Sequence, residues 1–317
     1  MKQKIIKTIY IGFFYAASMM TTHCFAQEAD DAMLKMMPEI PSEITDPSQR
    51  ATYLINHFWD KFNFKHTSLL MADHLLERCF VEYLDLLSLV PDDIRDQSIQ
   101  SFMKKSEEEP DIFSFVLQIS EHYLYDPESP VSDDEKLIPF LQYALQSALL
   151  DDGEKFRLSY LLDCISINNT GSIANDFSYS LMNGEKGTLH AIRADYTLLY
   201  FNDPECDDCR MLIRQLTGSP LISQYVQSGQ LKIITVYVND DLEAWKKHAN
   251  DVLHTWIYAY DAEQTINNEI IYNIKQFPAL YLLDKDKKVI LKELNFDTLE
   301  EYFRSSQLIT KKMYGTR

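Results

Sequence analysis

The sequence predicts an α+β protein with an all-α N-terminal domain followed by an α/β domain. Two observations support this division. Over residues 42–168 the apolar residues recur at helical spacing, with short connections and almost no β-branched runs. From Asn168 onward the period changes, and apolar runs of strand length alternate with helical segments. A length of 317 residues fits about two domains, so we place the helical domain at residues 42–170.

The first 26 residues predict a secretory signal peptide. Lys2, Lys4 and Lys7 form a positive start, residues 8–20 form an apolar run shorter than a membrane span, and Ala26 closes a cleavage site with small outer residues. We therefore expect a periplasmic or otherwise exported protein, cleaved after Ala26. Loss of three lysines and no acidic residue takes the formal charge from -18 to -21.

Two other fates of this segment stay open, a lipid on Cys24 and an uncleaved anchor. Residues 21–23 lack the Leu and small residues that lipoprotein signals place before the modified cysteine, so we do not expect membrane anchoring. The acidic net charge of the chain also disfavours one class of partner, the nucleic acids. With 48 acidic residues against 30 Lys and Arg, and no basic cluster, we expect no nucleic-acid binding.

Helices of the first domain are predicted from capping residues and apolar rows. Asp46, with Pro47 at the first helical position, starts the first helix. Ser132 with Glu135 predicts a capping box at the start of a later helix. The other helices are expected from Leu75 to Leu87, after Pro91, after Pro110 and after Gly153.

The second domain opens on a predicted hairpin. Asn183-Gly184 is a strong turn signal, alternation over residues 177–181 precedes it, and Leu189 to Ile192 is expected as the return strand. Further strands are expected at 196–201, 231–238, 256–258, 279–283 and 289–294, with helices after 206, around 245–252, at 266–274 and from 297 onward. This alternation predicts a central mixed sheet.

Cys206 and Cys209 are the residues best suited to carry chemistry. They follow a strand and a short polar loop, and the chain continues from them as a helix. A helix N-terminus offers unpaired N–H donors and a partial positive charge, which stabilise the thiolate of Cys206. Cys209, one turn later, can close a disulfide with it. The alternatives are a structural disulfide or a metal site, but no second ligand pair at zinc spacing exists, and we expect neither metal nor cofactor.

Three features together resemble the thioredoxin-fold thiol-disulfide oxidoreductases, in particular the exported branch allied to cytochrome-maturation thioredoxins. They are the C-x-x-C pair directly after a strand, the hairpin of residues 176–192, and Phe277-Pro278, which is similar to the family's cis-proline strand. The resemblance covers residues 172–307 and implies a thioredoxin-fold domain there. The N-terminal half also resembles an uncharacterised helical domain that precedes such domains in exported bacterial proteins, and no function comes with it.

The resemblance implies roles for four residues. Cys206 would attack a substrate disulfide and Cys209 would resolve the mixed disulfide, so both are the expected catalytic residues. Pro278 and Phe277 would lie beside the bound substrate chain, because a proline there has no N–H to donate and leaves room for it.

The sequence also departs from the family pattern. Glu205, Asp207 and Asp208 surround the first cysteine, where many relatives carry Trp before it and Gly-Pro after it. Their charge opposes the thiolate, which predicts a reducing couple near about -270 mV, as in thioredoxin. Relatives often bury a carboxylate that accepts the proton of the second cysteine, but the two usual positions hold Tyr200 and Leu212. The proton acceptor is therefore unassigned.

The sequence thus predicts an exported thiol-disulfide oxidoreductase that reduces protein disulfides and is itself reduced again by an electron donor of the cell envelope. The alternative is a partner-binding protein whose thioredoxin fold is a scaffold with little turnover. A thiol peroxidase is disfavoured, because Asp203 stands where that branch has Thr. Cys79 and Cys164 lie in apolar rows and are expected as core residues, with a disulfide between them as an alternative.

Overall fold

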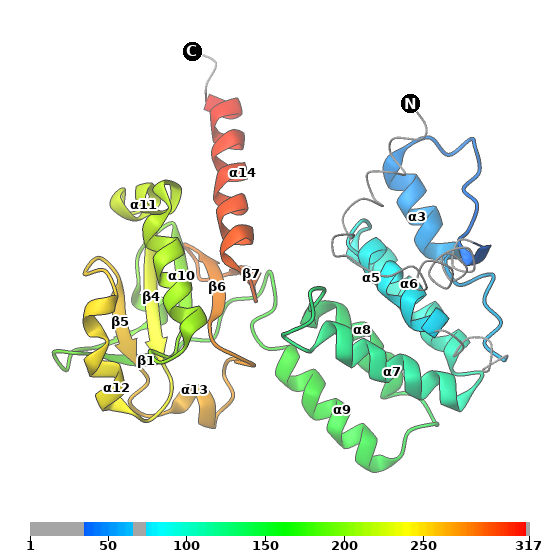
Figure 1. Ribbon diagram of the computed structural model, residues 1–317, viewed down its shortest axis with the longest axis horizontal. Helices are drawn as coiled ribbons and strands as arrows, with labels where there is room; N and C mark the ends of the chain where they lie inside the picture. Colours follow the sequence, from blue (N-terminus) through cyan, green and yellow to red (C-terminus); the bar gives the residue numbers. More distant parts are fainter. Residues whose placement is uncertain (1–34, 66–73, 315–317) are drawn as a thin grey trace, which may run out of the picture. The chain divides into compact units, whose positions relative to one another are not determined.

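The computed structural model of the protein describes residues 35–65 and 74–314 (Figure 1). The predicted signal peptide and its Ala26 cleavage site lie outside these residues. Contacts between residues divide the chain into two compact units, one ending at Ile119 and the other starting at Ser120. Each unit is considered by itself below. Within the described ranges, no helix is both long and apolar enough to cross a membrane.

The first unit is helical, as predicted. Asp46 caps its first helix by accepting a hydrogen bond from the Gln49 N–H at 3.0 Å. Its core is aromatic: the Trp59 ring stacks on that of Phe102 with centroids 4.1 Å apart. Its helices are α3 (Pro47–His57), α5 (Leu75–Leu87), α6 (Asp92–Ser106) and the larger part of α7 (Pro110–Leu124).

The second unit begins with the end of α7 and continues through α8 (Asp134–Ala144) and α9 (Asp152–Ile165). The predicted capping box at Ser132 is wrong. Asp133 caps α8, because its carboxylate accepts hydrogen bonds from the N–H groups of Glu135 and Lys136. The Ser132 hydroxyl instead donates to the carbonyl of Leu124 at 3.3 Å.

A seven-stranded sheet forms the centre of the second unit, in the order β2-β1-β5-β4-β3-β6-β7. It is mixed, as predicted: β3 pairs parallel with β4 and antiparallel with β6. Its strands are β1 (Ser178–Leu181), β2 (Lys186–Thr188), β3 (Tyr196–Phe201), β4 (Leu231–Tyr237), β5 (Ile257–Tyr260), β6 (Ala279–Asp284) and β7 (Val289–Lys292).

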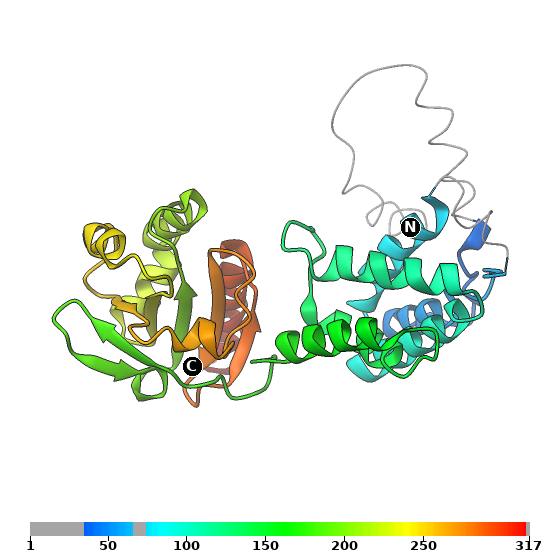
Figure 2. The same cartoon turned by 90° about the horizontal axis from the view of Figure 1, so that it is seen from below.

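Both faces of this sheet are covered. Leu198 and Tyr200 of β3 pack into a core with α10 (Asp207–Gly218), α11 (Pro220–Gln227) and α14 (Phe296–Tyr314), which lie together in Figures 1 and 2. Leu199 and Phe201 point to the core on the opposite face. This core includes Phe177, Leu189 and, from α13 (Thr265–Asn268), Ile266. A strand buried on both faces explains the continuous apolar run of β3.

Three predicted elements differ from the structure. The helix expected around 245–252 is α12 (Leu242–Lys247), which is followed by the 3-10 helix η3 (Ala249–Asp251). The return strand of the hairpin is β2, not Leu189 to Ile192, because the Asn183-Gly184 turn pairs Ser180 with Lys186; residues Leu189–Ala191 form the 3-10 helix η2. The helix expected at 266–274 ends as α13 at Asn268, because Ile270 adopts a positive φ of 51°, which no α-helix accommodates.

Candidate active site

The loop after β3 positions the two cysteines. The Asp203 carboxylate accepts a hydrogen bond from the Glu205 N–H through Oδ1 and from Asn239 Nδ2 through Oδ2, both at 2.9 Å. The Cys206 N–H donates to the Asp203 carbonyl at 3.1 Å. Asp203 therefore fixes the turn that delivers Cys206 to the start of α10. Sequence reasoning considered Asp203 only as a missing Thr and did not find this structural role.

Cys206 is the N-cap residue of α10. Its sulfur accepts a hydrogen bond from the Cys209 N–H at 3.2 Å and lies 3.6 Å from the Phe277 carbonyl oxygen. The side chain is partly exposed. A sulfur that receives an N–H at a helix N-terminus is placed where a negative charge is stabilised. The geometry thus suits Cys206 to react as a thiolate.

Cys209 has the opposite environment. Its side chain is 1% exposed, and burial raises the pKa of the Cys209 thiol to about 12, with the hydrogen bond to Cys206 acting in the same direction. Cys209 is therefore a protonated thiol at neutral pH. The two environments suit the two roles expected in a dithiol: the accessible sulfur of Cys206 can attack, and the shielded sulfur of Cys209 lies one turn later, where it can resolve the mixed disulfide.

The acidic surroundings of Cys206 are less negative than the sequence indicated. Asp207 is 95% exposed and forms an ion pair with the Arg210 guanidinium, which also donates to the Pro204 carbonyl at 2.9 Å. Glu205 and Asp208 are exposed. Arg210 offsets part of the repulsion, and the i, i+3 spacing of Asp207 and Arg210 was a signal that could have revealed it.

The two positions without a carboxylate are both buried. The Tyr200 hydroxyl donates to the Cys209 carbonyl at 2.9 Å, and burial raises the pKa of Tyr200 far above its ordinary value. Leu212 is 4% exposed and belongs to the core beneath α10. Neither side chain can accept a proton from Cys209 at neutral pH, so Tyr200 has a structural role here.

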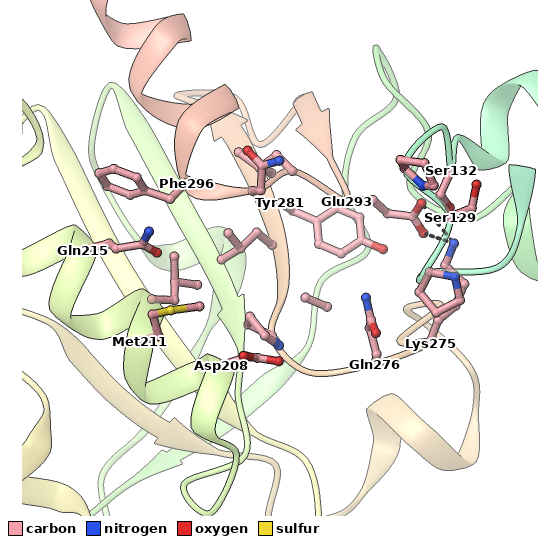
Figure 3. A pocket seen from close by; sticks show the side chains of 18 of the residues that line it. Ser129, Ser132, Asp208, Met211, Gln215, Lys275, Gln276, Tyr281, Glu293 and Phe296 are labelled. Carbon is pink, nitrogen blue, oxygen red and sulfur yellow. Dashed lines mark hydrogen bonds and ion pairs between the residues drawn. The ribbon is translucent and has the colours of Figure 1, made fainter. Parts of the chain in front are cut away.

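A cavity of about 430 Å³ adjoins the cysteine helix and Pro278, which follows Phe277 through a cis peptide bond. In Figure 3, Asp208 and Met211 of α10 lie on one side of it, and Ser129 and Ser132 of the loop before α8 lie on the other. The structure thus brings Pro278 and Asp208 together beside one cavity. The role of the α7–α8 loop in lining this cavity was not visible from the sequence.

Lys275 and Glu293 line this cavity and form a charged cluster with the buried Asp134. Lys275 Nζ lies 2.8 Å from Asp134 Oδ1 and 3.2 Å from the Glu293 carboxylate. The three side chains are 9%, 0% and 23% exposed, respectively. Burial raises the pKa of Glu293 to about 7, and the neighbouring Asp134 adds to this shift. No sequence signal pairs these residues, because Asp134 and Lys275 are 141 positions apart.

The two other cysteines among the described residues belong to the core. Cys79 and Cys164 are buried free thiols, so the alternative of a disulfide between them is not realised in the structure. Burial raises the pKa of the Cys79 thiol to about 12, which makes it unreactive at neutral pH. In the described part of the chain, no group of three or more His, Cys, Asp and Glu side chains is arranged to hold a metal ion.

Comparison with protein families finds two matches. A family described as thioredoxin-like matches residues 194–289, and a domain of unknown function, DUF5106, matches residues 17–168. No curated protein matches the chain. Neither match distinguishes the cytochrome-maturation branch, which stays an expectation.

Comparison with solved structures places both regions in one relative. The crystal structure of a thioredoxin-like protein from Bacteroides caccae is 34% identical, with a TM-score of 0.82, and the match covers 84% of this chain and 97% of that chain. The C-terminal domain of an uncharacterised protein from Bacteroides fragilis is 40% identical over 43% of this chain and 98% of its own, with a TM-score of 0.43. The thioredoxin domain of a thiol-disulfide oxidoreductase from Bacteroides vulgatus is 23% identical over 43% of this chain and 98% of its own, with a TM-score of 0.36.

Proposed function

The chain belongs to the thioredoxin-like proteins, and we propose that it is an exported thiol-disulfide oxidoreductase that reduces disulfides in protein substrates. One observation carries the proposal. The sulfur of Cys206 is partly exposed at the N-terminus of α10, and the buried thiol of Cys209 lies one turn later. This is the arrangement that a dithiol needs in order to attack a disulfide and then release the product.

The first step uses Cys206. Its thiolate attacks one sulfur of the substrate disulfide, a mixed disulfide forms between Cys206 and the substrate, and the other substrate sulfur leaves as a thiolate. The N–H of Cys209, 3.2 Å from the Cys206 sulfur, stabilises the attacking charge. Partial exposure gives the substrate access to this sulfur.

The second step uses Cys209. Once deprotonated, its sulfur attacks the Cys206 sulfur, the bond between Cys206 and the substrate breaks, and the second substrate thiolate leaves. The substrate disulfide is then reduced by two electrons and the Cys206–Cys209 pair is oxidised to a disulfide. An electron donor of the cell envelope must restore the dithiol before the next cycle.

The cavity beside Pro278 is the proposed site for the substrate chain. Pro278 and Asp208 both line it, and Phe277 carries the carbonyl that contacts the Cys206 sulfur. An extended chain placed there would bring its cysteine next to Cys206 without competing for an N–H at Pro278. Its mixture of apolar and polar walls suits a polypeptide segment.

We propose a periplasmic location, for which the first 26 residues provide the argument. A reducing potential is proposed as well, because Glu205 and Asp208 oppose the Cys206 thiolate while Arg210 offsets only Asp207. The mechanism needs neither a metal nor a cofactor, since the two sulfurs exchange the electrons themselves.

Insulin reduction tests the proposal. The chain starting at Gln27, supplied with dithiothreitol, should accelerate insulin precipitation, and Cys206→Ser should reduce the rate to that of dithiothreitol alone. Cys79→Ser is the matched control and should retain the activity, because Cys79 is buried away from solvent. If wild type and Cys206→Ser are equally inactive, the chain is a binding scaffold and the proposed reductase activity is wrong.

A further inference from the structure

Cys209 needs a proton acceptor before it can attack the mixed disulfide. The thiol is 1% exposed and protonated at neutral pH, so bulk water reaches it poorly. Tyr200 and Leu212 do not meet this need. The acceptor must therefore belong to another group that shares a space with the Cys209 side chain.

A small second cavity adjoins Cys209 on the side of the loop that follows β3. Its volume is about 10 Å³, close to the minimum that holds one water. Its polar lining includes Asn202, Asp203 and His248. A water needs two to four polar partners to be stable in such a place, and these side chains supply them.

Asn202 indicates that this cavity holds a polar occupant. The residue is 2% exposed, and its Oδ1 atom is buried without a hydrogen-bond partner. An unsatisfied buried oxygen costs about 1–3 kcal/mol. A water that donates one hydrogen to Asn202 Oδ1 removes this cost and remains within the space that Cys209 and His248 also line.

His248 is the group in this cavity that is prepared to act as a base. It follows α12 (Leu242–Lys247), and its Nδ1 lies 2.6 Å from Asp251 Oδ2. A carboxylate on Nδ1 selects the tautomer with the proton on that nitrogen and leaves Nε2 as an acceptor. The His248 side chain is 21% exposed, so a proton that it accepts can pass on to solvent.

The other charged and titratable groups that face this cavity are already engaged. Asp203 accepts a hydrogen bond on each carboxylate oxygen. Arg210 is a cation paired with Asp207, and the Tyr258 hydroxyl donates to the Trp245 carbonyl at 2.7 Å. Arg210 and Tyr258 are not bases at neutral pH, and protonation of Asp203 would compete with the hydrogen bonds that hold the turn before Cys206.

We propose that His248 accepts the proton of Cys209 through one water in this cavity, with Asp251 as the positioning residue that orients the imidazole. The inference deepens the proposed function and rests on it. In the mixed disulfide, the Cys209 S–H gives its proton to the water while the water gives one to His248 Nε2. The Cys209 sulfur forms the bond to Cys206, the bond from Cys206 to the substrate breaks, and His248 later releases its proton to solvent or to the leaving thiolate.

Reaction of the reduced mature chain with an aromatic disulfide, dithiobisnitrobenzoate, separates the two steps. Attack by Cys206 releases one coloured thiolate, and resolution by Cys209 releases a second. His248→Gln should leave the rate of the first phase within about two-fold of wild type. It should slow the second phase about 10- to 100-fold at pH 7, which is at or below the lower end of the usual range for loss of a general base. His254→Gln, an exposed histidine of the same loop, is the matched control and should change neither phase.

The pH profile of the second phase identifies the role of His248. Because the base must be unprotonated to accept the proton of Cys209, the wild-type rate should rise with pH and then level off. The His248→Gln rate should instead keep rising with pH, because only hydroxide and direct ionisation of Cys209 then remain to remove its proton. Asp251→Asn should slow the second phase less than His248→Gln and spare the first phase.

The outcomes separate the two claims. An unchanged second phase in His248→Gln overturns the inference and leaves the proposed function standing. If His248→Gln does not fold, an unchanged second phase in folded Asp251→Asn overturns it as well. A wild-type chain that releases no thiolate through Cys206 contradicts the proposed function, and the inference falls with it.

Discussion

At the scale of single residues, the balance of charge around Cys206 depends on Arg210. Without it, Glu205, Asp207 and Asp208 would all oppose the thiolate. The ion pair of Arg210 with Asp207 removes one of these three charges from the balance. Because Asp207 is exposed, each such charge changes the stability of the thiolate by only about 0.2–1 kcal/mol.

Opposite substitutions at this site should shift the reduction potential in opposite directions. Arg210→Gln removes a cation, destabilises the reduced form, and should lower the potential by about 5–20 mV. Asp208→Asn removes an anion and should raise it by a similar amount. Equilibration with a glutathione or dithiothreitol buffer measures both. Shifts of the same sign would contradict this account of tuning.

Residue-scale features differ in how far sequence predicts them. The Cys206–Cys209 pair and its place at a helix start follow from local spacing, and Phe277-Pro278 follows from the resemblance. The contact of Asp203 with Asn239 and the shared cavity of Cys209 and His248 do not, because each joins segments that are distant in the sequence. Hydrogen bonds across such loops leave no periodic signal in the sequence.

At the scale of elements, the Asp134–Lys275–Glu293 cluster fixes α8 to the segments that flank β6 and β7 within the second unit. Burial at this position disfavours the ionised form of Glu293. Its pKa of about 7 lies above its ordinary value of 4.5, so the folded chain binds more protons than the unfolded chain between about pH 4.5 and 7. Ionisation of Glu293 therefore lowers the stability as the pH rises through this range.

Glu293→Gln should remove this pH dependence. The free energy of unfolding of the variant, relative to wild type, should rise between pH 4.5 and 8 by an amount on the order of 1–2 kcal/mol. Urea unfolding at several pH values measures the difference. Glu269→Gln, at an exposed position, is the control and should show no such trend. A pH-independent difference for Glu293→Gln would show that the carboxyl titrates normally.

The ends of helices and strands are harder to predict from the sequence than their presence. Ser132 is the predicted cap of α8, but the neighbouring Asp133 has the carboxylate that accepts hydrogen bonds from two N–H groups. The second strand of the first hairpin was placed too late, since the turn at Gly184 sets the register directly. In both places the deciding feature is local: a carboxylate that reaches two N–H groups, and a tight turn that fixes the register of the next strand.

At the scale of the whole molecule, the sequence divides into a helical part and a mixed α/β part, and the relative from Bacteroides caccae spans both. The change from helical to strand periodicity near Asn168 was sufficient to predict this division. The contribution of the α7–α8 loop to the cavity beside Pro278 was not predictable, because it depends on how distant segments fold together within the second unit.

Capture of the mixed disulfide tests the central claim most directly. In Cys209→Ser, the resolving thiol is absent, so envelope proteins attacked by Cys206 should remain bound to the chain. Non-reducing electrophoresis and mass spectrometry of the cell envelope should reveal adducts that dithiothreitol releases and that join a substrate cysteine to Cys206. Absence of adducts, or their persistence in the Cys206→Ser, Cys209→Ser double variant, would contradict a dithiol mechanism through Cys206.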